Sequence, residues 1–278
     1  MDKKDLDVLR TEEFIAHDLE LLKNSDRWKR YGRLIANAMG AISWVGTILS
    51  MGAARSGEKS QEAFNQLYEE WLKVHKEKIG YLIEALDEVA GRLENVPDEL
   101  GARIESEEYL GLVRRAFRSW DSAETLEKQG YIVNLISNAA ATKLCPDDMI
   151  RLFNDWLDTY HEVHFKVIRE IYQNPGCTRY EIWTSVSGDL PREDSAEADL
   201  FKLLIRDLST GGVIRQNRET TYDGQFVKQS TKGRKRGSGS GTMESAFEDT
   251  KPYVLTELGS QFVHYTMNAI VKRLKSEA

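Results

Sequence analysis

The sequence contains very little cysteine, the residue that forms disulfides and many metal sites. Cys145 and Cys177 are the only two cysteines among 278 residues, and their separation is far from that of a metal-binding pair. We therefore expect a reducing compartment in which both thiols are free or buried. The first residues, Met1–Leu6, are followed by no apolar run, so we also expect no secretory signal and a cytoplasmic location.

Histidine is also scarce, and no combination of residues matches a catalytic or metal-binding motif. None of the five histidines has a serine or cysteine nearby in the context of a nucleophile. One segment carries Asp155, Asp158, His161 and His164, but each step of three residues turns about 60° around a helix, so the four side chains would not share one face. The Gly/Ser tract 237–241 lacks the lysine of a phosphate-binding loop and is typical of a flexible linker. We predict a protein that is not an enzyme, with no catalytic residue, metal or cofactor.

Charge is distributed unevenly along the chain. Residues 1–160 contain 21 Lys and Arg against 29 Asp and Glu, a balance of −8, whereas residues 161–278 contain 17 against 16, a balance of +1. Neither part has the strong positive charge of a protein that binds nucleic acid over its whole surface. The length exceeds that of a typical single domain, and 41% apolar residues are enough for a substantial core. We predict two domains, a helical bundle over 1–160 and a second domain over 161–278.

The segment 34–54 contains no charged residue, and basic residues flank it on both sides. Its 21 residues equal the length of a membrane span, but several polar residues and three glycines dilute its hydropathy. We interpret it as a buried central helix of the bundle. The alternative is a helix that enters a membrane or oligomerises only on activation, using small residues for close approach. The candidate contact residues for that alternative are Gly40, Ile42, Trp44 and Gly46.

Apolar residues that recur every three or four positions predict further helices in the bundle. One helix is expected over residues 58–94, which is roughly 50 Å at 1.5 Å per residue. Ser106 is expected to begin a helix, another is expected from Ala123 to Leu144, and the pattern after Pro146 allows one continuous helix into the second domain. The aromatic residues expected in the core are Trp71, Phe117, Trp156 and Trp183.

The second domain begins with three predicted helices. A helical run over 165–172 stops at Pro175, and Thr178 with Glu181 matches a capping box that starts the second helix. The third helix is expected from about Ala196 and ends at a pair of glycines. Its expected apolar face consists of Leu200, Leu203, Leu204 and Leu208.

Two short strands and a last helix are predicted to follow. Val213 and Ile214 begin the first strand, residues 253–255 form the returning strand, and the last helix opens at Thr256. The phrases Asp207–Ile214 and Leu255–Gly259 resemble the end of the third helix and the exit from the wing in MarR-like winged-helix proteins. The helical patterns predict a mainly α fold class with an N-terminal helical bundle. The resemblance implies a winged-helix α+β domain after the bundle, with a flexible basic wing over about 224–250.

The middle of the chain resembles another group of bacterial proteins. The segments Glu107–Arg118, Glu124–Lys128 and Tyr131–Ala139, followed by a helix into the winged-helix-like end, are similar to the Abi-alpha (abortive infection) proteins, although Ile136–Ala139 departs from their commoner residues. The resemblance implies a non-enzymatic phage-defence component and assigns no residue a role. We expect its helical domain to oligomerise or act as effector, and its winged helix to dock a protein or a nucleic acid. The alternative is a winged-helix DNA-binding transcriptional regulator.

The wing contains five cations within nine residues, beside flexible glycines, where they could follow a phosphate backbone. These candidate nucleic-acid-binding residues are Lys228, Lys232, Arg234, Lys235 and Arg236. The start of the third helix has the opposite charge, which phosphates would repel. Its acids are Glu193, Asp194, Glu197 and Asp199, offset by Arg192, Lys202 and Arg206. Three functions of this domain stay open: sequence-specific DNA reading, non-specific contact through the wing, and protein docking.

We predict that replacing Lys232, Arg234, Lys235 and Arg236 with alanine weakens nucleic-acid binding and flattens its salt dependence. Each phosphate contact that is lost should reduce the slope of log K against log salt by about 0.9 on duplex DNA. Titrating a labelled duplex at several salt concentrations measures both quantities. Unchanged affinity and slope would remove the wing from the binding surface, and a parent protein that binds no nucleic acid at low salt would contradict this function.

Overall fold

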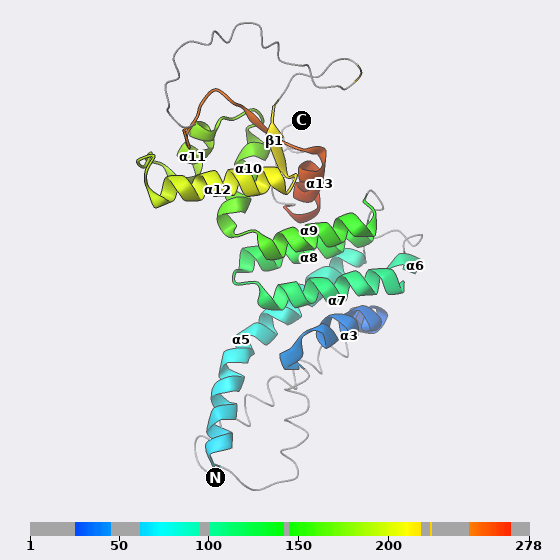
Figure 1. Cartoon of the computed structure of the whole chain (residues 1–278). Coiled ribbons are helices and arrows are strands. Elements are labelled where there is room, and N and C mark those ends of the chain that lie inside the picture. The colour runs from blue at the N-terminus through cyan, green and yellow to red at the C-terminus, as the bar shows by residue number, and fades with distance from the viewer. Residues whose placement is uncertain are drawn as a thin grey trace, which may run out of the picture. The chain divides into compact units, whose positions relative to one another are not determined.

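A computed structural model of the chain describes residues 26–45, 62–94, 101–141, 145–217, 223 and 245–267, without the side chains of 27, 28 and 62–76. The chain divides into two compact units, Met1–Thr159 and Tyr160–Ala278. It is mainly helical, as predicted, and the described residues contain one small two-stranded sheet (Figure 1). The N-terminal unit contains α2 (Asp26–Arg30), α3 (Gly32–Ala41), α5 (Glu62–Leu93), α6 (Gly101–Ile104), α7 (Glu107–Ser122), α8 (Leu126–Ala141) and α9 (Asp147–Thr159).

The core of the N-terminal unit lies among α7, α8 and α9, which all pack on one another. Helix α3 packs against α7, and α5 packs against α8 (Figure 1). Ser106 caps α7 as predicted, because its side chain accepts a hydrogen bond from the backbone N–H of Tyr109 at 3.2 Å. The largest fully buried side chains of these three helices are Tyr109, Leu110, Phe117 and Phe153.

The predicted long helix is continuous over its described part. Helix α5 has 32 residues, which is about 48 Å at 1.5 Å per residue. In Figure 1 its first half extends well past α7, and its second half lies beside α8. The predicted apolar positions of that second half are all buried: Leu82, Leu86, Val89 and Leu93. The packed half of α5 therefore anchors the whole helix to the bundle.

The uncharged segment does not form the single helix that the sequence suggested. Helix α3 ends at Ala41, and Ile42 has extended dihedral angles (φ −99°, ψ 113°). The change of direction buries Ile42, Trp44 and Val45 together, and it brings the Trp44 indole N–H to Asp121 Oδ1 at 2.5 Å. Residues 46–54, including Gly46, lie outside the described residues. No helix among the residues that the structure describes is long and apolar enough to cross a membrane.

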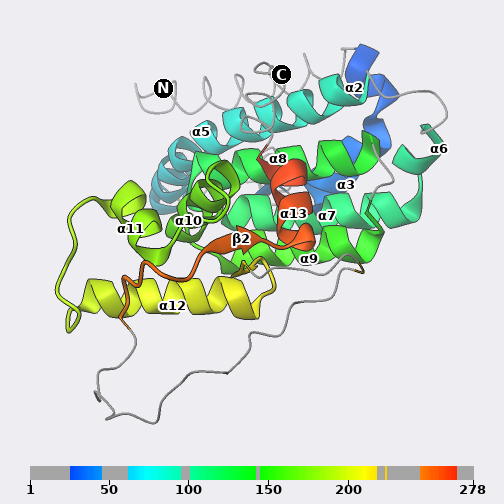
Figure 2. The same cartoon turned by 90° about the horizontal axis from the view of Figure 1, so that it is seen from above.

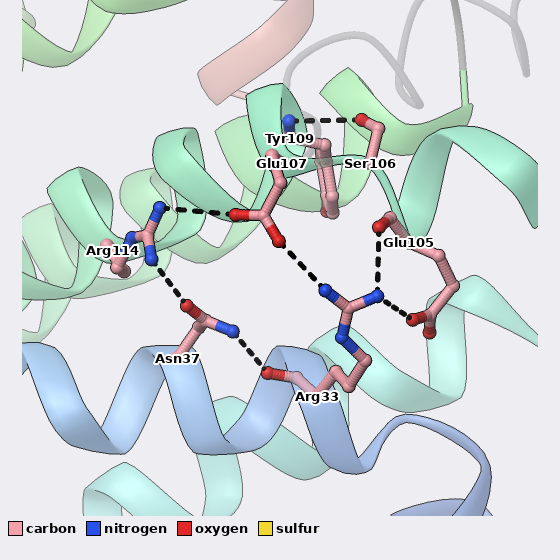
Figure 3. Close-up of polar contacts among 7 residues, drawn as sticks. All are labelled: Arg33, Asn37, Glu105, Ser106, Glu107, Tyr109 and Arg114. Atoms are coloured by element: carbon pink, nitrogen blue, oxygen red, sulfur yellow. Dashed lines mark hydrogen bonds and ion pairs between the residues drawn. The ribbon is translucent and has the colours of Figure 1, made fainter.

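A polar network positions α3 on α7 (Figure 3). The Arg33 guanidinium contacts Glu105 Oε2 at 3.3 Å and Glu107 Oε1 at 2.9 Å. One turn later, Asn37 accepts a hydrogen bond from Arg114 at 3.0 Å and donates one to the Arg33 carbonyl at 2.7 Å. Exposed ion pairs of this kind contribute only about 0–1 kcal/mol each. The network therefore determines where α3 lies along α7, while the buried apolar face of α3 supplies most of the stability.

The C-terminal unit combines four helices with the two strands. Its elements are α10 (Glu162–Gln173), α11 (Arg179–Ser187), α12 (Ala196–Thr210), β1 (Ile214–Gln216), β2 (Tyr253–Leu255) and α13 (Glu257–Thr266). The strands are antiparallel, with Ile214 opposite Leu255 and Gln216 opposite Tyr253. The loop after α10 also joins the sheet, because Gly176 donates to the Tyr253 carbonyl and Tyr253 donates to the Cys177 carbonyl, both at 2.8 Å.

A continuous helix from Pro146 into the second domain is not formed. Helix α9 ends at Thr159, and His161 has an extended conformation (φ −84°, ψ 167°) at the N-cap of α10. The His161 backbone N–H donates to Nδ1 of His164 at 3.1 Å, which stabilises the start of a new helix. The sequence interpretation missed this break because histidine is an unusual partner in a capping box.

The predicted capping box at the start of α11 is confirmed. Thr178 accepts from the Glu181 backbone N–H at 3.3 Å, and Glu181 accepts from the Thr178 backbone N–H at 2.8 Å. The buried face of α12, by contrast, was predicted wrongly. Leu200 and Leu203 are exposed, and their expected places in the core are taken by other residues of the helix. The buried residues of α12 are Ala198, Phe201, Leu204, Ile205 and Leu208.

We expect truncation of Phe117, Trp156 or Trp183 to alanine to lower the free energy of unfolding by about 3–5 kcal/mol each. All three side chains are buried, so each substitution removes apolar contacts and leaves a cavity. Denaturant melts of the single variants measure the loss. A loss below about 1 kcal/mol would contradict the packing at that position. The side chain of Trp71 is not described, so its predicted burial stays a prediction.

Candidate anion-binding groove in the C-terminal unit

A groove of about 690 Å³ lies between α12 and the strands of the C-terminal unit. Figure 2 shows α12 and β2, two of the elements that contribute lining residues. Four of the described lining residues are cations and none of the described lining residues is a carboxylate, a lining that suits an anion. The lining residues are Arg179, Lys202, Ile205, Arg206, Ser209, Ile214, Arg215, Gln216 and Tyr253.

Arg179 is positioned by its place at the start of α11 and by its contacts with Tyr253. It is the first residue of α11, directly after the Thr178 cap, so the start of the helix sets its direction. Its Nε donates to the Tyr253 hydroxyl at 3.0 Å, and its guanidinium lies 5.6 Å from the centre of the Tyr253 ring. Since Tyr253 is the first residue of β2, Arg179 also connects α11 to the strand side of the groove.

Two further cations come from one face of α12. Lys202 and Arg206 are four residues apart, which places them side by side on a helix. Lys202 forms ion pairs of 3.8 Å with Glu193 and with Asp199, and Arg206 lies 4.0 Å from Asp207. Surface ion pairs at these distances are weak. Both side chains can therefore turn to an anion in the groove at little free-energy cost.

Glu193 has a structural role that its sequence position did not suggest. Its carboxylate accepts a hydrogen bond from the Ala246 backbone N–H at 2.9 Å and another from the Ser245 hydroxyl. These bonds, with smaller help from Lys202, hold the pKa of Glu193 below its ordinary value. Glu193 thus joins the segment before α12 to the segment that leads into β2. Figure 2 shows this second segment, in orange, passing beside α12.

Aromatic packing strengthens the same junction. Phe247 stacks on Phe201 of α12, with ring centroids 5.8 Å apart and planes 11° apart. Trp183 of α11 contacts both rings, at 5.4 Å from Phe247 and 5.2 Å from Phe201. Aromatic pairs of this geometry contribute about 0.5–1.5 kcal/mol beyond the area that they bury. The three rings therefore hold α11, α12 and the segment before β2 in one arrangement.

The other acids near the start of α12 are also engaged locally. Arg192 donates two hydrogen bonds of 2.8 Å to Asp194, and this pairing lowers the pKa of the Asp194 carboxyl. The pKa of Glu197 is lowered by its own backbone N–H and by Ser195 in the first turn of α12. Arg192 thus offsets the charge of Asp194, but Glu193 and Glu197 are hydrogen-bonded mainly by neutral groups and stay ionised, so the start of α12 keeps acids that would repel phosphates.

Cys177, beside the groove's strand, is not activated for chemistry. Burial, with smaller help from the nearby carboxylates of Glu170 and Glu181, raises the pKa of its thiol to about 11. A reactive cysteine needs a lowered pKa, so this thiol stays protonated at neutral pH. Among the described residues, no group of three or more His, Cys, Asp and Glu is placed to hold a metal ion.

The sequence predictions and the groove overlap only in part. All five predicted wing cations, from Lys228 to Arg236, lie outside the described residues. Lys202 and Arg206 were noted only as a partial offset to nearby acids, and the structure places both in the groove wall. Arg179 and Arg215 were missed. The signal for Arg179 is its position at the helix start, directly after the Thr178 cap. The signal for Arg215 is the alternation along β1, where it follows the buried Ile214.

We expect Glu193→Gln to lower the melting temperature at neutral pH, because an amide loses the charge that holds Ala246 and Ser245. A carboxyl whose pKa is lower in the folded state than in the unfolded state stabilises the protein at pH values above its unfolded pKa of about 4.3. This stabilisation is lost as the pH falls through the folded pKa. The difference between parent and variant should therefore disappear at acid pH, as measured by circular dichroism melts. Glu84→Gln, at an exposed site of α5, is the control. A difference that does not change with pH would contradict this role.

The chain was also compared with known proteins. No family model, curated protein or solved structure matches it. The function of the groove is therefore inferred from its geometry.

Proposed function

We propose that this chain is a non-enzymatic binding protein whose C-terminal unit is a winged-helix module that holds the phosphate backbone of a nucleic acid. The observation that carries the proposal is the groove beside α12, whose described lining residues include Arg179, Lys202, Arg206 and Arg215 and no carboxylate. Phosphate contacts of Lys and Arg supply most of the affinity of non-specific nucleic-acid binding, through release of counterions. A groove with four cations is suited to such contacts.

The order of elements supports the winged-helix part of the proposal. Three helices, two antiparallel strands and a final helix follow one another from α10 to α13, which is the order expected for that fold. The loop at Gly176 and Cys177 is bonded to β2, so the sheet is tied to the start of α11. The wing predicted over about 224–250 would continue from these strands and bring its cations to the same nucleic acid.

Non-specific contact is favoured over the reading of a DNA sequence. Base reading would require polar, preferably cationic, side chains on the exposed part of the third helix. The exposed positions in the first half of α12 include Glu197, Asp199 and Leu200. The cations Lys202 and Arg206 lie farther along the helix, in the wall of the groove. This distribution supports backbone binding and counts against the alternative of a sequence-specific transcriptional regulator.

The resemblance to Abi-alpha proteins supports a bacterial phage-defence setting, in which the N-terminal unit oligomerises or acts as effector. We place this function in the cytoplasm, and the two buried free thiols are consistent with a reducing compartment. Within the N-terminal unit, α3 is held on α7 by a buried apolar face, by Arg33 and by Trp44. An effector that acts through the segment 34–54, in a membrane or in an oligomer, would have to break these contacts on activation.

We expect Arg206→Ala to weaken binding of a random-sequence duplex and to reduce its salt slope by about 0.9, the value for one phosphate contact. Lys202→Ala together with Arg206→Ala should reduce it by about 1.8. Fluorescence anisotropy of a labelled duplex between about 50 and 200 mM salt measures both effects. Arg206 is 71% exposed, so the substitution should not disturb the fold.

Arg192→Ala is the matched control. It removes the same charge from a side chain that is 85% exposed and does not line the groove. No groove contact is removed, so the salt slope should stay that of the parent protein. Equal effects of Arg192→Ala and Arg206→Ala would show that only net charge matters, and would overturn the groove as the binding site.

A further inference from the structure

Helix α12 exposes two large apolar side chains on the side that faces away from the core. Leu200 is 49% exposed and Leu203 is 40% exposed. They are three residues apart and therefore adjacent on the helix surface. Since Phe201, Leu204 and Ile205 fill the core side of the same helix, the two leucines cannot also turn inward. We call the surface made by Leu200, Leu203 and their exposed neighbours the outer face of α12.

Opposite charges lie along one edge of this outer face. Asp199 and Arg206 are seven residues apart, so they differ by only about 20° around the helix axis and lie about 10 Å apart along it. Both side chains are well exposed. One edge of the outer face is thus negative near the start of the helix and positive near its end.

This arrangement is complementary to itself in the reverse direction. When a second α12 lies antiparallel to the first, a two-fold axis between positions 200 and 203 places each Leu200 against Leu203 of the other copy. The same axis keeps the charged edges of the two copies on the same side of the pair. It places each Asp199 beside Arg206 of the other copy, with an axial offset of about 3 Å. Two identical ion pairs then flank four leucines. A two-fold interface requires such self-complementarity, because the same patch serves both partners.

We propose that the outer face of α12 binds a second copy of this chain in an antiparallel two-fold pair. The proposal goes beyond the nucleic-acid function and does not depend on it. The two surfaces share one residue, however, because Arg206 both lines the groove and pairs with Asp199 in the two-fold contact. Self-association and nucleic-acid binding should therefore compete for Arg206.

The first test is the mass of the full-length protein in solution. Sedimentation velocity over a range of concentrations should show a dimer, twice 31.8 kDa, that dissociates on dilution. Leu200→Ser with Leu203→Ser should raise the dissociation constant by at least about tenfold. Leu126→Ser makes the same change at a leucine of α8 that is 61% exposed, and it should leave the dimer unchanged. A parent protein that is monomeric throughout, or a serine pair that leaves the dimer intact, overturns the proposal.

Charge reversal tests the antiparallel register. Asp199→Arg alone places two arginines together at each end, and Arg206→Asp alone places two aspartates together, so each should weaken the dimer. The double variant Asp199→Arg/Arg206→Asp restores opposite charges in a two-fold pair and should recover the dimer. Failure to recover overturns this register, provided that circular dichroism melts show all variants folded.

The same variants separate this proposal from the nucleic-acid function. The Leu200→Ser/Leu203→Ser monomer retains Arg179, Lys202, Arg206 and Arg215, so it should bind a labelled duplex at least as well as the parent protein. Loss of duplex binding in this monomer would overturn the competition between the two surfaces. Failure of both parent and monomer to bind duplex would count against the groove alone, while the mass measurements would still decide the self-association.

Discussion

The arrangement of the C-terminal unit depends on the junction between the start of α12 and the segment that leads into β2. Glu193 accepts hydrogen bonds from Ser245 and Ala246, and Phe247 stacks on Phe201 beside it. These contacts join segments that are about fifty residues apart in the chain. Closing so long a loop costs conformational entropy, and several interactions together offset that cost. They therefore help to set the distance between α12 and the segment that leads into β2.

A second junction secures the other end of the same groove. Thr256 caps α13 and also binds the link between α12 and β1. Its backbone N–H donates to the Val213 carbonyl at 2.9 Å, and its hydroxyl donates to the Gly212 carbonyl at 2.6 Å. Gly259 permits this approach, because a Cβ there would lie 2.1 Å from the Val213 carbonyl oxygen. The two junctions flank β2 in the chain, at residues 245–247 and 256–259. Together they fix β2, and with it Arg179, relative to the cations of α12.

Helix α12 illustrates how one element can serve two surfaces. Its core side is filled by aromatic and branched residues, so its other sides are free to carry Lys202 and Arg206 toward the groove and Leu200 and Leu203 toward solvent. In the N-terminal unit, α3 shows a comparable division between an apolar side against α7 and the polar contacts of Arg33. Both helices combine a buried stripe that supplies stability with peripheral charges that determine position or binding.

Local rules were enough to predict the features that depend on neighbouring residues. The Ser106 cap, the capping box of Thr178 and Glu181, the two strands and the long helix α5 were predicted because each depends on contacts within about one helical turn or on a regular apolar repeat. The aromatic core positions Phe117, Trp156 and Trp183 were predicted for the same reason. The winged-helix fold and the functions connected with it stay proposals.

What the sequence determined by itself is therefore the mainly helical class and the starts of α7, α11, α12 and α13, since short-range hydrogen bonds and periodicity decide these. Tertiary structure decided the rest. Which leucines of α12 are buried depends on the partner that covers each side, and Ile42 interrupts the uncharged segment because its neighbours gain burial against other helices. The groove was also decided at this level. Whether a carboxylate such as Glu193 repels a phosphate or joins two segments of the fold depends on the groups that folding brings to it, and these come from distant parts of the chain.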